Sequence, residues 1–504
     1  MKRSLIQRSL TSGALLLICV LAFSLAGFAQ SGGVTTDPEI STIVSNISSA
    51  NIAITAKTMQ NFRTRQSCSG EPEKGHGVTA ARDYLVKQYK AIPGLEVRLD
   101  QFTHPNCTTS PTYNVIAWIP GKNPNRLVVI GGHYDSRTTD VFDTTSDAPG
   151  GNDSGAQTAV VLELARVLAG HSYDSTIVFM SFSGEEQGLY GSGSIAANLN
   201  RYFKNPEVIA MLNTDIPGGD ISANRPQDFK EFRLYSSGIP RERLSTDPDG
   251  TTDNTSPSRG VMRYVGTWAG AYVPAIKIHP ELREDRPGRA SDHVSFVNEG
   301  DAAVRIMERF ECSPSPVDNS CGGPFPCPPP KHIPKFCKDI TFTTTHQHSP
   351  RDLFKFITPT YAATIAQVIA SSGATLARAP GAPQNFTATG NSMQGIRIKF
   401  DNPTAGNTDH FIMAARPVTQ NFYHRRIKVS HDTQRLYKPG ELGITPGVSF
   451  FVSVASVDKL GHESLFAYSE VRCDTTECKI PQYAGKFREP MPPPAPAKDP
   501  ADKE

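Results

Sequence analysis

The sequence predicts an α/β domain with helices on both faces of a central sheet, followed by a small all-β sandwich. In the central region, short apolar runs alternate with a helical pattern, as expected for strands that are buried on both faces. From about residue 380, short apolar runs are separated by Gly, Pro and Asn without a helical pattern between them. At 504 residues the chain is long enough for two or three structural units.

The first 29 residues have the pattern of a secretory signal peptide. Lys2, Arg3 and Arg8 precede an apolar run that ends near the small residues Gly27 and Ala29. A membrane anchor is the alternative, but the run is short for a bilayer span. No later run in the sequence is long and apolar enough to span a bilayer. We therefore expect a secreted or periplasmic protein with no transmembrane anchor after removal of residues 1–29.

Composition and charge argue against some classes of partner. The hydrophobic fraction of 38% and the charged fraction of 20% are those of a globular protein. Three of the 51 basic residues lie in the signal segment, which leaves 48 against 49 acidic residues. A nearly neutral chain gives no electrostatic reason to expect nucleic acid or an anionic membrane as a partner.

The cysteines predict disulfide bonds. Cys19 lies in the signal segment, and the remaining eight are Cys68, Cys107, Cys312, Cys321, Cys327, Cys337, Cys473 and Cys478. An even number in an exported chain favours disulfides, although the sequence does not give their connectivity. The alternative is a zinc cluster formed by the four between 312 and 337, but their spacings of nine, six and ten residues lack the close pairs of structural zinc sites.

Local patterns place the elements of the first domain in order. Residues 30–110 are mainly helical in pattern, with helix formers and a one-sided apolar stripe over 79–89. The stretch 156–169 places Val160, Val161, Leu164, Val167 and Leu168 on one helical stripe. Buried strands are predicted at 114–121, 126–130, 176–182 and 208–212.

The last part of the chain has the pattern of short strands followed by a polar tail. Residues 396–400 and 449–457 predict strands of the β-sandwich. The Pro-, Lys- and Glu-rich residues 475–504 lack the apolar side chains for a core, and we expect them to be disordered.

Three predicted strands end directly in side chains that can bind metal. The first leads to His133, the next to Glu185 and Glu186, and the third to Asp215. Because the carboxyl ends of strands in an open α/β sheet form the binding crevice, we expect these side chains to converge. His133 and Asp135 stand two apart, so Asp135 can accept a hydrogen bond from the imidazole and fix its tautomer. A surface His beside a solvated Asp is the ordinary alternative.

Two acidic motifs also have ordinary explanations. Asp153 precedes the 156–169 helix and could be an N-cap, but the glycines around it allow a backbone that turns the carboxylate toward a metal. One carboxylate can bridge two cations about 3.5–4 Å apart. Glu185 and Glu186 could favour a helix N-terminus. Alternatively, one of them binds metal while the other moves a proton between the attacking water and the leaving amine.

One further ligand must come from later in the chain. His293 in Ser291-Asp292-His293 and His348 in the stretch that also contains His346 are the two candidates. Either could be an ordinary surface histidine.

Together these motifs resemble the zinc peptidases of family M28, which include bacterial leucyl aminopeptidases. The matching stretches are NVIAWIPG, GGHYDS, APGGNDSG, SFSGEEQGLYGS, LNTD, SDHVSF and HSPRD, over roughly residues 40 to 375. The resemblance implies the mixed, mostly parallel sheet of the zinc-peptidase fold for residues 30–378. It also implies peptide substrates and hydrolysis of the N-terminal peptide bond by a metal-activated water.

The resemblance also implies a co-catalytic pair of Zn²⁺ ions. His133 and Asp215 would hold one ion, Glu186 and His348 the other, and Asp153 would bridge them. Glu185 would be the general acid/base, and Asp135 would orient His133. The family's last ligand lies four residues before an Asp, as His348 does before Asp352, so the Ser291-Asp292-His293 motif would line the site. Two departures are Ser154 after the bridging Asp and a Cys/Pro-rich insertion at 311–339.

Other functions remain open on the same residues. A carboxypeptidase or dipeptidase would need a basic pocket, for which Arg283, Arg286 and Arg289 are available. A single-zinc glutaminyl cyclase and a non-catalytic binding protein are the further alternatives. Residues 382–474 resemble a fibronectin type III domain, which implies a spacer or a contact with a surface or polymer.

Overall fold

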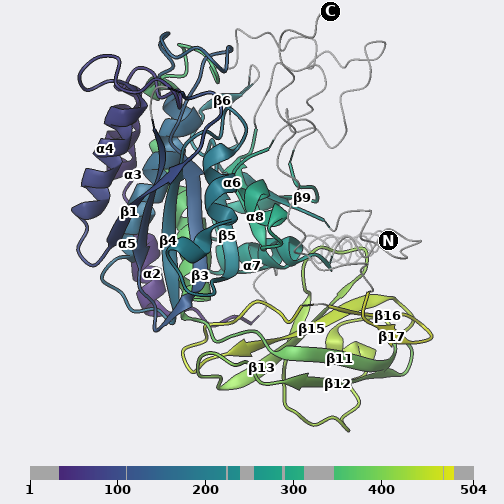
Figure 1. The fold of residues 1–504 in the computed structure, drawn as a ribbon. Helices are drawn as coiled ribbons and strands as arrows, with labels where there is room; N and C mark the ends of the chain where they lie inside the picture. Colours follow the sequence, from purple (N-terminus) through teal and green to yellow (C-terminus); the bar gives the residue numbers. More distant parts are fainter. Residues whose placement is uncertain are drawn as a thin grey trace, which may run out of the picture.

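A computed structural model describes residues 33–108, 111–222, 225–226, 228–238, 255–285, 290–310, 346–468 and 470–481. The chain forms a large α/β domain and a smaller β-sandwich beside it (Figure 1). The predicted signal peptide, the 311–339 insertion, Arg286, Arg289 and residues 482–504 lie outside the described residues.

The central sheet is mixed, as predicted. Parallel pairs join β4 to β3, β3 to β5, β5 to β10 and β8 to β9. The pairs β1–β2, β2–β4 and β10–β8 are antiparallel. In spatial order the eight strands are β1 (Glu96–Phe102), β2 (Thr112–Ile119), β4 (Ser175–Phe182), β3 (Asn123–His133), β5 (Glu207–Thr214), β10 (Ala303–Glu308), β8 (Glu231–Ser236) and β9 (Lys277–Glu281). The predicted strands correspond to β2, β3, β4 and β5, which all lie inside the sheet, as expected for apolar runs that are buried on both faces.

Helices cover both faces of this sheet. Alternate strand residues belong to two separate cores: Val128 and Ile130 face the larger one, whereas Leu127 and Val129 face the smaller one. The larger core lies under α2 (Pro38–Ser45), α3 (Ser49–Gln60), α4 (Gly77–Lys90), α5 (Gln157–Leu168), α7 (Pro257–Tyr272) and α10 (Pro359–Arg378). The smaller core lies under α6 (Tyr190–Ala196), η2 (Leu199–Arg201) and α8 (His293–Asn298).

The C-terminal part is an all-β unit, also as predicted. A two-stranded sheet and a five-stranded sheet enclose one core that includes Phe386, Ile398, Met413 and Val452. The strands are β11 (Gln384–Asn391) and β12 (Gly395–Asp401) in one sheet, and β14 (Arg425–Val429), β13 (His410–Pro417), β15 (Phe450–Val457), β16 (Val471–Cys473) and β17 (Cys478–Lys479) in the other. Short elements complete the structure: η1 (Gly151–Ala156), β6 (Ile221–Ser222), β7 (Arg225–Pro226), η5 (Phe354–Phe356) and η6 (Pro439–Leu442).

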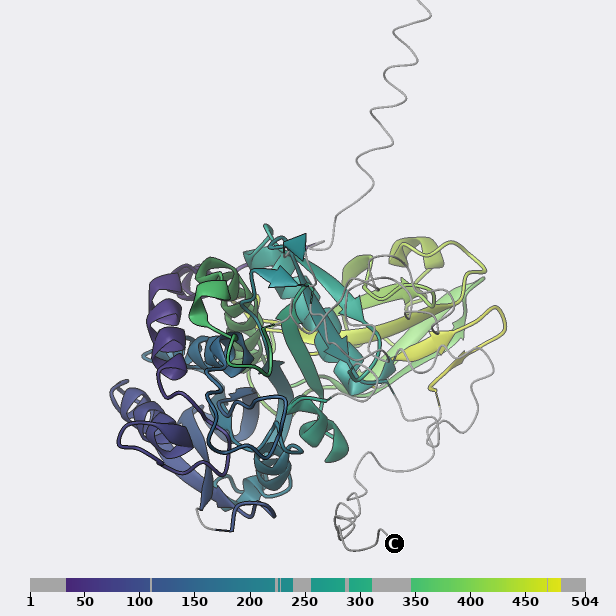
Figure 2. The ribbon, with the colours of Figure 1, turned by 90° about the horizontal axis from the view of Figure 1, so that it is seen from above.

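The β-sandwich packs against the α/β domain through polar contacts. The Tyr264 hydroxyl on α7 donates to the Glu463 carbonyl at 2.7 Å, and Arg263 Nε donates to the Asn421 carbonyl at 2.8 Å. His462 Nε2 lies 2.8 Å from Asp37, the N-cap of α2. From above, the two units lie side by side (Figure 2). These contacts fix their relative orientation.

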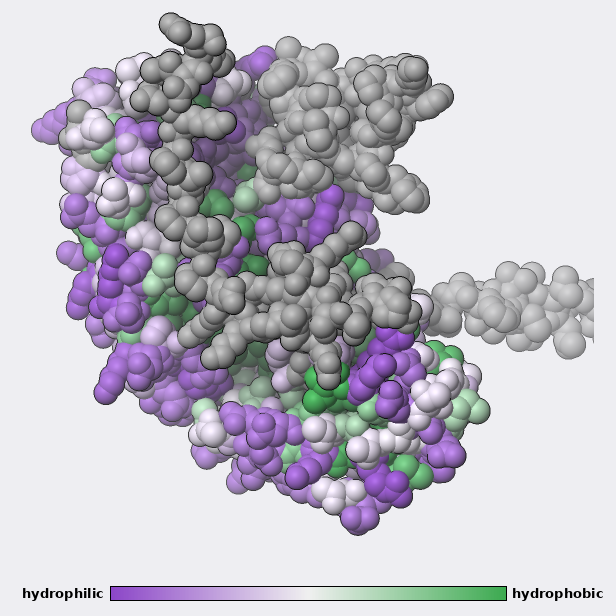
Figure 3. Space-filling model, turned by 45° about the vertical axis from the view of Figure 1, so that its right-hand side comes forward, coloured by the Kyte–Doolittle hydropathy of each residue, from purple (hydrophilic) through white to green (hydrophobic). Residues whose placement is uncertain are grey.

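Four of the predicted disulfide-forming cysteines are paired, as Cys68–Cys107 and Cys473–Cys478. The other four lie outside the described residues. Among the described residues, every helix is too short or too polar to cross a bilayer. Hydrophilic side chains dominate the coloured surface in Figure 3, with small hydrophobic patches between them.

Candidate metal centre

The predicted ligands come together at the carboxyl ends of three neighbouring strands. His133 is the last residue of β3, Asp215 directly follows β5, and Glu185 and Glu186 come shortly after β4. β3 pairs in parallel with both β4 and β5, so these strand ends share one edge of the sheet.

Six side chains form two groups of possible ligands. One comprises His133, Glu185 and Asp215, the other comprises Asp153, Glu186 and His348, and the ligand atoms within each group lie within 4.8 Å of one another. His133 Nε2 is 3.5 Å from Asp215 Oδ1, and His348 Nε2 is 3.2 Å from Glu186 Oε2. All six side chains are at most 13% exposed.

Asp153 connects the two groups. Its Oδ1 lies 3.3 Å from His133 Nε2, and its Oδ2 lies 3.0 Å from His348 Nε2. The residue is not an N-cap, because α5 begins at Gln157 and Asp153 has non-helical dihedral angles of φ −105° and ψ 85°. The peptide bond that follows Asp153 is cis. The carboxylate is thus turned away from the helix and toward both histidines.

Asp135 contacts both the His133 imidazole and the backbone of Glu185 and Glu186. His133 Nδ1 lies 3.1 Å from the Asp135 carbonyl oxygen and 3.5 Å from Oδ1 of the same residue. The predicted contact is therefore made mainly to the backbone of Asp135. Its carboxylate instead accepts the backbone N–H groups of Glu185 and Glu186 at 3.4 and 3.3 Å. Asp135 thereby links the strand ends of β3 and β4.

The other candidate histidines belong to neither group. His346 stacks on the Phe356 ring with centroids 3.6 Å apart. His293 is fully buried, and its Nε2 lies 2.8 Å from the Glu284 carbonyl. The neighbouring Asp292 is also fully buried, where burial raises its pKa to about 7. Among these candidates, only His348 lies beside Asp153 and Glu186.

Three polar contacts at the centre were not predicted from the sequence. Arg137 Nε donates to Glu186 Oε2 at 2.7 Å, and Arg305 Nη2 lies 2.8 Å from Asp215 Oδ2. Gln347 Nε2 donates to Asp153 Oδ2 at 2.7 Å. A charged residue inside a buried apolar strand, as Arg305 is in VRIME, is a signal that could have drawn attention to one of them.

The electrostatics of the centre pull protons toward its histidines. Burial opposes a charge on His133, but the field of Glu185 and the contact with Asp135 outweigh it and raise the pKa well above its usual value. For His348, burial is similarly outweighed by the field of Glu186 and the bond to Asp153, and its pKa is raised. Burial raises the pKa of the Glu185 carboxyl well above its ordinary range. The pocket therefore favours positive charge at the positions where the two histidines face Asp153.

This donor set fits divalent cations. Imidazole nitrogens and carboxylate oxygens are the ligands that zinc takes in catalytic sites. Two buried oxygens, Asp153 Oδ1 and Glu186 Oε1, have no hydrogen-bond donor among the described residues. Buried acceptors without partners are costly, so their presence favours a cation at this place.

Two groups of His and carboxylate ligands at the strand ends of an α/β sheet are typical of a metalloenzyme. The sequence profile described as Peptidase family M28 matches residues 114–372, which include all six side chains. The chain belongs to peptidase family M28, as the resemblance of its motifs predicted.

Relatives of this chain agree with that assignment. A protein of Leptosphaeria maculans named as a probable zinc metalloprotease is 31% identical, over 70% of this chain and 79% of its own length. The LapA aminopeptidase of Legionella pneumophila has a similar structure with a TM-score of 0.47 and 16% identity, over 69% of this chain and 78% of LapA. A glutaminyl cyclase of Bacteroides thetaiotaomicron matches with a TM-score of 0.42 and 13% identity, over 65% and 97% of the two chains. These two structural likenesses are too distant to bear on the reaction.

Proposed function

We propose that this protein is an exported aminopeptidase that uses two zinc ions to remove N-terminal residues from peptides. The observation on which the proposal rests is the position of Asp153, whose two oxygens face His133 at 3.3 Å and His348 at 3.0 Å. A carboxylate that faces two nitrogen ligands in opposite groups has the arrangement of a ligand shared by two cations. The zinc metalloprotease name of the relative supports the choice of metal.

The charge balance supports two ions rather than one. Five carboxylates gather at the centre, of which Glu186 and Asp215 are paired with Arg137 and Arg305. The other three belong to Asp135, Asp153 and Glu185, and all are buried or nearly so. Buried negative charge needs positive partners, which His133 and His348, with their raised pKa values, supply in part when no metal is bound. Two zinc ions bound here would supply them, and they would polarise the substrate carbonyl and stabilise its developing negative charge.

Glu185 is the proton carrier of the proposed reaction. Its Oε2 lies 3.9 Å from His133 Nε2, so its carboxylate borders the space between the ligands. In the reaction Glu185 accepts a proton from the attacking water and donates one to the leaving amine. The bond between the carbonyl carbon and the peptide nitrogen breaks as this second proton arrives. Its burial and raised pKa suit a group that must hold a proton between the two steps.

The remaining carboxylates suit an N-terminal substrate amine. Asp135 holds the backbone of Glu185 and Glu186 and keeps both side chains in place. The carboxylates of Asp135, Asp153 and Glu185 would attract the partly positive N–H groups of a substrate amine and repel a terminal carboxylate. For the carboxypeptidase alternative, the one described arginine of its basic pocket is Arg283, which lies against the Tyr235 ring at 5.6 Å. The two disulfides are consistent with export to an oxidising compartment.

Aminoacyl anilides with free and blocked amines test this proposal. We expect cleavage of the free-amine substrate only, and a loss of about 10²–10⁴-fold in kcat for Glu185→Gln. Glu73→Gln is the matched control, because this side chain is 65% exposed on a surface loop. Cleavage of blocked substrates would refute the aminopeptidase, and full activity of Glu185→Gln would remove the proposed proton carrier.

A further inference from the structure

Arg65 is a completely buried cation that uses all of its donors inside the protein. Its Nε donates to the Tyr134 carbonyl at 2.7 Å. Nη1 donates to the carbonyls of Met59 and Pro149 at 2.9 and 2.7 Å. Nη2 donates to the Gly150 carbonyl at 3.0 Å and to Ser154 Oγ at 3.3 Å. The five N–H groups of the guanidinium therefore meet five oxygens, which a lysine with three donors could not satisfy.

Four of these five acceptors lie beside the proposed zinc ligands in the chain. Pro149, Gly150 and Ser154 belong to the loop that presents Asp153, and Tyr134 lies between His133 and Asp135. The loop has little freedom here: Gly150 has φ +49°, and a Cβ added to it would lie 2.8 Å from Arg65 Nη2. The guanidinium thus fixes the backbone on one side of the bridging carboxylate.

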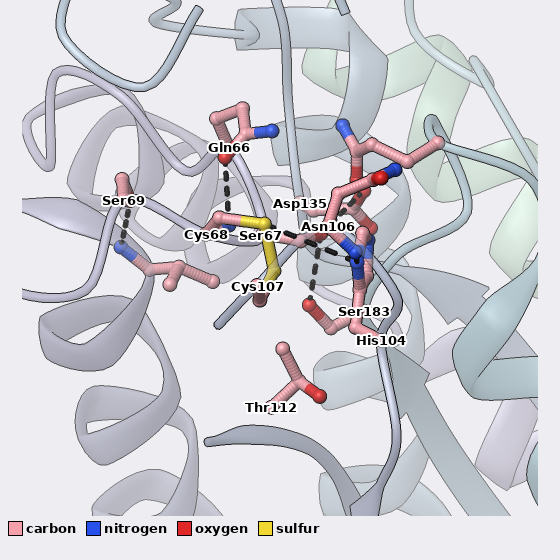
Figure 4. The surroundings of a disulfide bond; sticks show 12 residues. Gln66, Ser67, Cys68, Ser69, His104, Asn106, Cys107, Thr112, Asp135 and Ser183 are labelled. Carbon is pink, nitrogen blue, oxygen red and sulfur yellow. Dashed lines mark hydrogen bonds between the residues drawn. A yellow bond between two sulfur atoms is a disulfide. The ribbon is translucent and has the colours of Figure 1, made fainter. Parts of the chain in front are cut away.

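Segment 65–68 also holds the neighbouring strand end. Ser67 Oγ donates to Asp135 Oδ2 at 3.2 Å and lies 3.2 Å from Ser183 Oγ (Figure 4). The Arg65 backbone is hydrogen-bonded to Ser136, with Arg65 N 3.2 Å from Ser136 Oγ and Ser136 N 3.3 Å from the Arg65 carbonyl. One short irregular segment thereby contacts both the loop of Asp153 and the residue behind His133.

The segment is anchored at its end by the Cys68–Cys107 disulfide. It lies between α3, which ends at Gln60, and α4, which begins at Gly77, so no helix or strand fixes it. Cys107 belongs to the stretch after β1, where His104 packs on the Tyr190 ring with centroids 4.6 Å apart. Figure 4 shows the disulfide on one side of Ser67 and Asp135 on the other. The disulfide is the one covalent link between segment 65–68 and the stretch after β1 among the described residues.

We propose that segment 65–68 is a positioning element of the metal centre: Arg65 and Ser67 hold the backbone around Asp153 and Asp135, and the Cys68–Cys107 disulfide keeps them there. The inference rests on the proposed zinc binding but not on the aminopeptidase reaction. Zinc affinity consequently depends on a disulfide that supplies no ligand. Groups that hold metal ligands in orientation affect metal affinity by about 10- to 100-fold when they are altered.

Zinc titration of the full chain against a chromophoric chelator tests this inference. Arg65→Lys is expected to weaken zinc binding by about 10- to 100-fold. Arg63→Lys is the matched control, because Arg63 is on the same stretch but 54% exposed and paired with Glu73 and Asp147. We expect the control to bind zinc like the wild type, and excess zinc to restore kcat of Arg65→Lys with an unchanged KM.

The disulfide is tested by a second pair of variants. Cys68→Ser with Cys107→Ser is expected to weaken zinc binding, whereas Cys473→Ser with Cys478→Ser removes a distant bond in the β-sandwich and should leave it unchanged. Ser67→Ala gives a milder change if either larger variant fails to fold, as judged by circular dichroism of the metal-free protein. Folded variants with wild-type zinc affinity and a lowered melting temperature would overturn the inference. Failure of the wild type to bind zinc would overturn the proposed function as well.

Discussion

His462 joins the two structural units through Asp37 and is also bonded to Asp458 of its own unit, and its removal should lower the stability of the protein in a pH-dependent way. Its Nδ1 lies 2.7 Å from Asp458 Oδ2 and its Nε2 lies 2.8 Å from Asp37 Oδ2, while its side chain is 3% exposed. A hydrogen bond to a charged group contributes about 1.5–3 kcal/mol. Both carboxylates keep other donors, since Arg378 and the Glu39 N–H contact Asp37 and the Leu460 N–H contacts Asp458. We therefore expect His462→Gln to lower the free energy of unfolding by about 3 kcal/mol.

The pH dependence follows from the direction of the pKa shift. Burial lowers the pKa of His462, but the hydrogen bonds to Asp458 and Asp37 outweigh it and raise the pKa above the usual value. The charged imidazole therefore stabilises the folded protein fully below about pH 6.5, the unfolded value, and this contribution is lost as the pH rises through the raised folded value. Toward acid pH, the lowered pKa values of Asp37 and Asp458 set the limit.

Urea unfolding of wild type and His462→Gln between pH 5 and 9 measures this difference. His410→Gln is the matched control, because His410 also pairs with a carboxylate, Asp409 at 2.9 Å, but on the surface. We expect the difference for His462 to be largest near pH 6 and to shrink toward pH 9, and the control to change stability by less than about 1 kcal/mol. Equal stability of His462→Gln and wild type at pH 6, or a gap that widens toward pH 9, would refute the reasoning.

Three further predictions address the centre and the β-sandwich. Gly150→Ala should lower the melting temperature and weaken zinc binding, because the added Cβ would lie 2.5 Å from the Asp153 carbonyl oxygen at a φ of +49°. Gly170→Ala is the control, because Gly170 also has a positive φ but no atom lies within 4 Å of the added Cβ. Removal of zinc by a chelator should lower the melting temperature, because a ligand present at 100 times its Kd stabilises the folded protein by about 2.7 kcal/mol. An unchanged melting curve would exclude a bound metal. Arg416→Met should cost about 1.5–3 kcal/mol in urea unfolding, because it removes bonds of 2.6 and 3.0 Å to the buried Glu470. Glu470 keeps the Tyr423 hydroxyl at 2.7 Å and Arg263 at 3.5 Å. Unchanged stability of Arg416→Met would refute that account.

The order of elements was predictable because their signals are local. The apolar runs that end near His133, Glu185 and Asp215 are buried on both faces, and this burial requires continuous hydrophobicity whatever the neighbouring strands are. The convergence of the three strand ends then follows from parallel pairing alone. The inner strands β10 and β8 and the edge strand β9 were not predicted. β8 contains Arg233 and β9 contains His279 and Pro280, which interrupt any apolar pattern.

The candidate ligands were recognisable from chemistry, and the spacing argument placed the Asp135 carboxylate near the His133 imidazole, at 3.5 Å. The spacing of His133 and Asp135 indicated a carboxylate that accepts from imidazole. In the structure the carbonyl oxygen lies closer, at 3.1 Å against 3.5 Å for Oδ1. The carboxylate also accepts the backbone N–H groups of Glu185 and Glu186. A spacing argument therefore finds the residue but not the backbone oxygen that also contacts the ring.

Residues that hold the ligands were harder to find than the ligands themselves. A zinc ligand is nearly always a His, a Cys or a carboxylate, whereas a residue that holds a loop needs only a donor or acceptor at the right point. Asp352 illustrates this difference: its two carboxylate oxygens accept the N–H groups of Asn152 and Asp153 at 2.9 Å each, and its carbonyl accepts the Gly151 N–H at 2.7 Å. Because His348 lies four residues earlier, these bonds join the last proposed ligand to the loop of the bridging one. The HSPRD spacing therefore reflects how His348 is brought to Asp153, across about two hundred residues of chain.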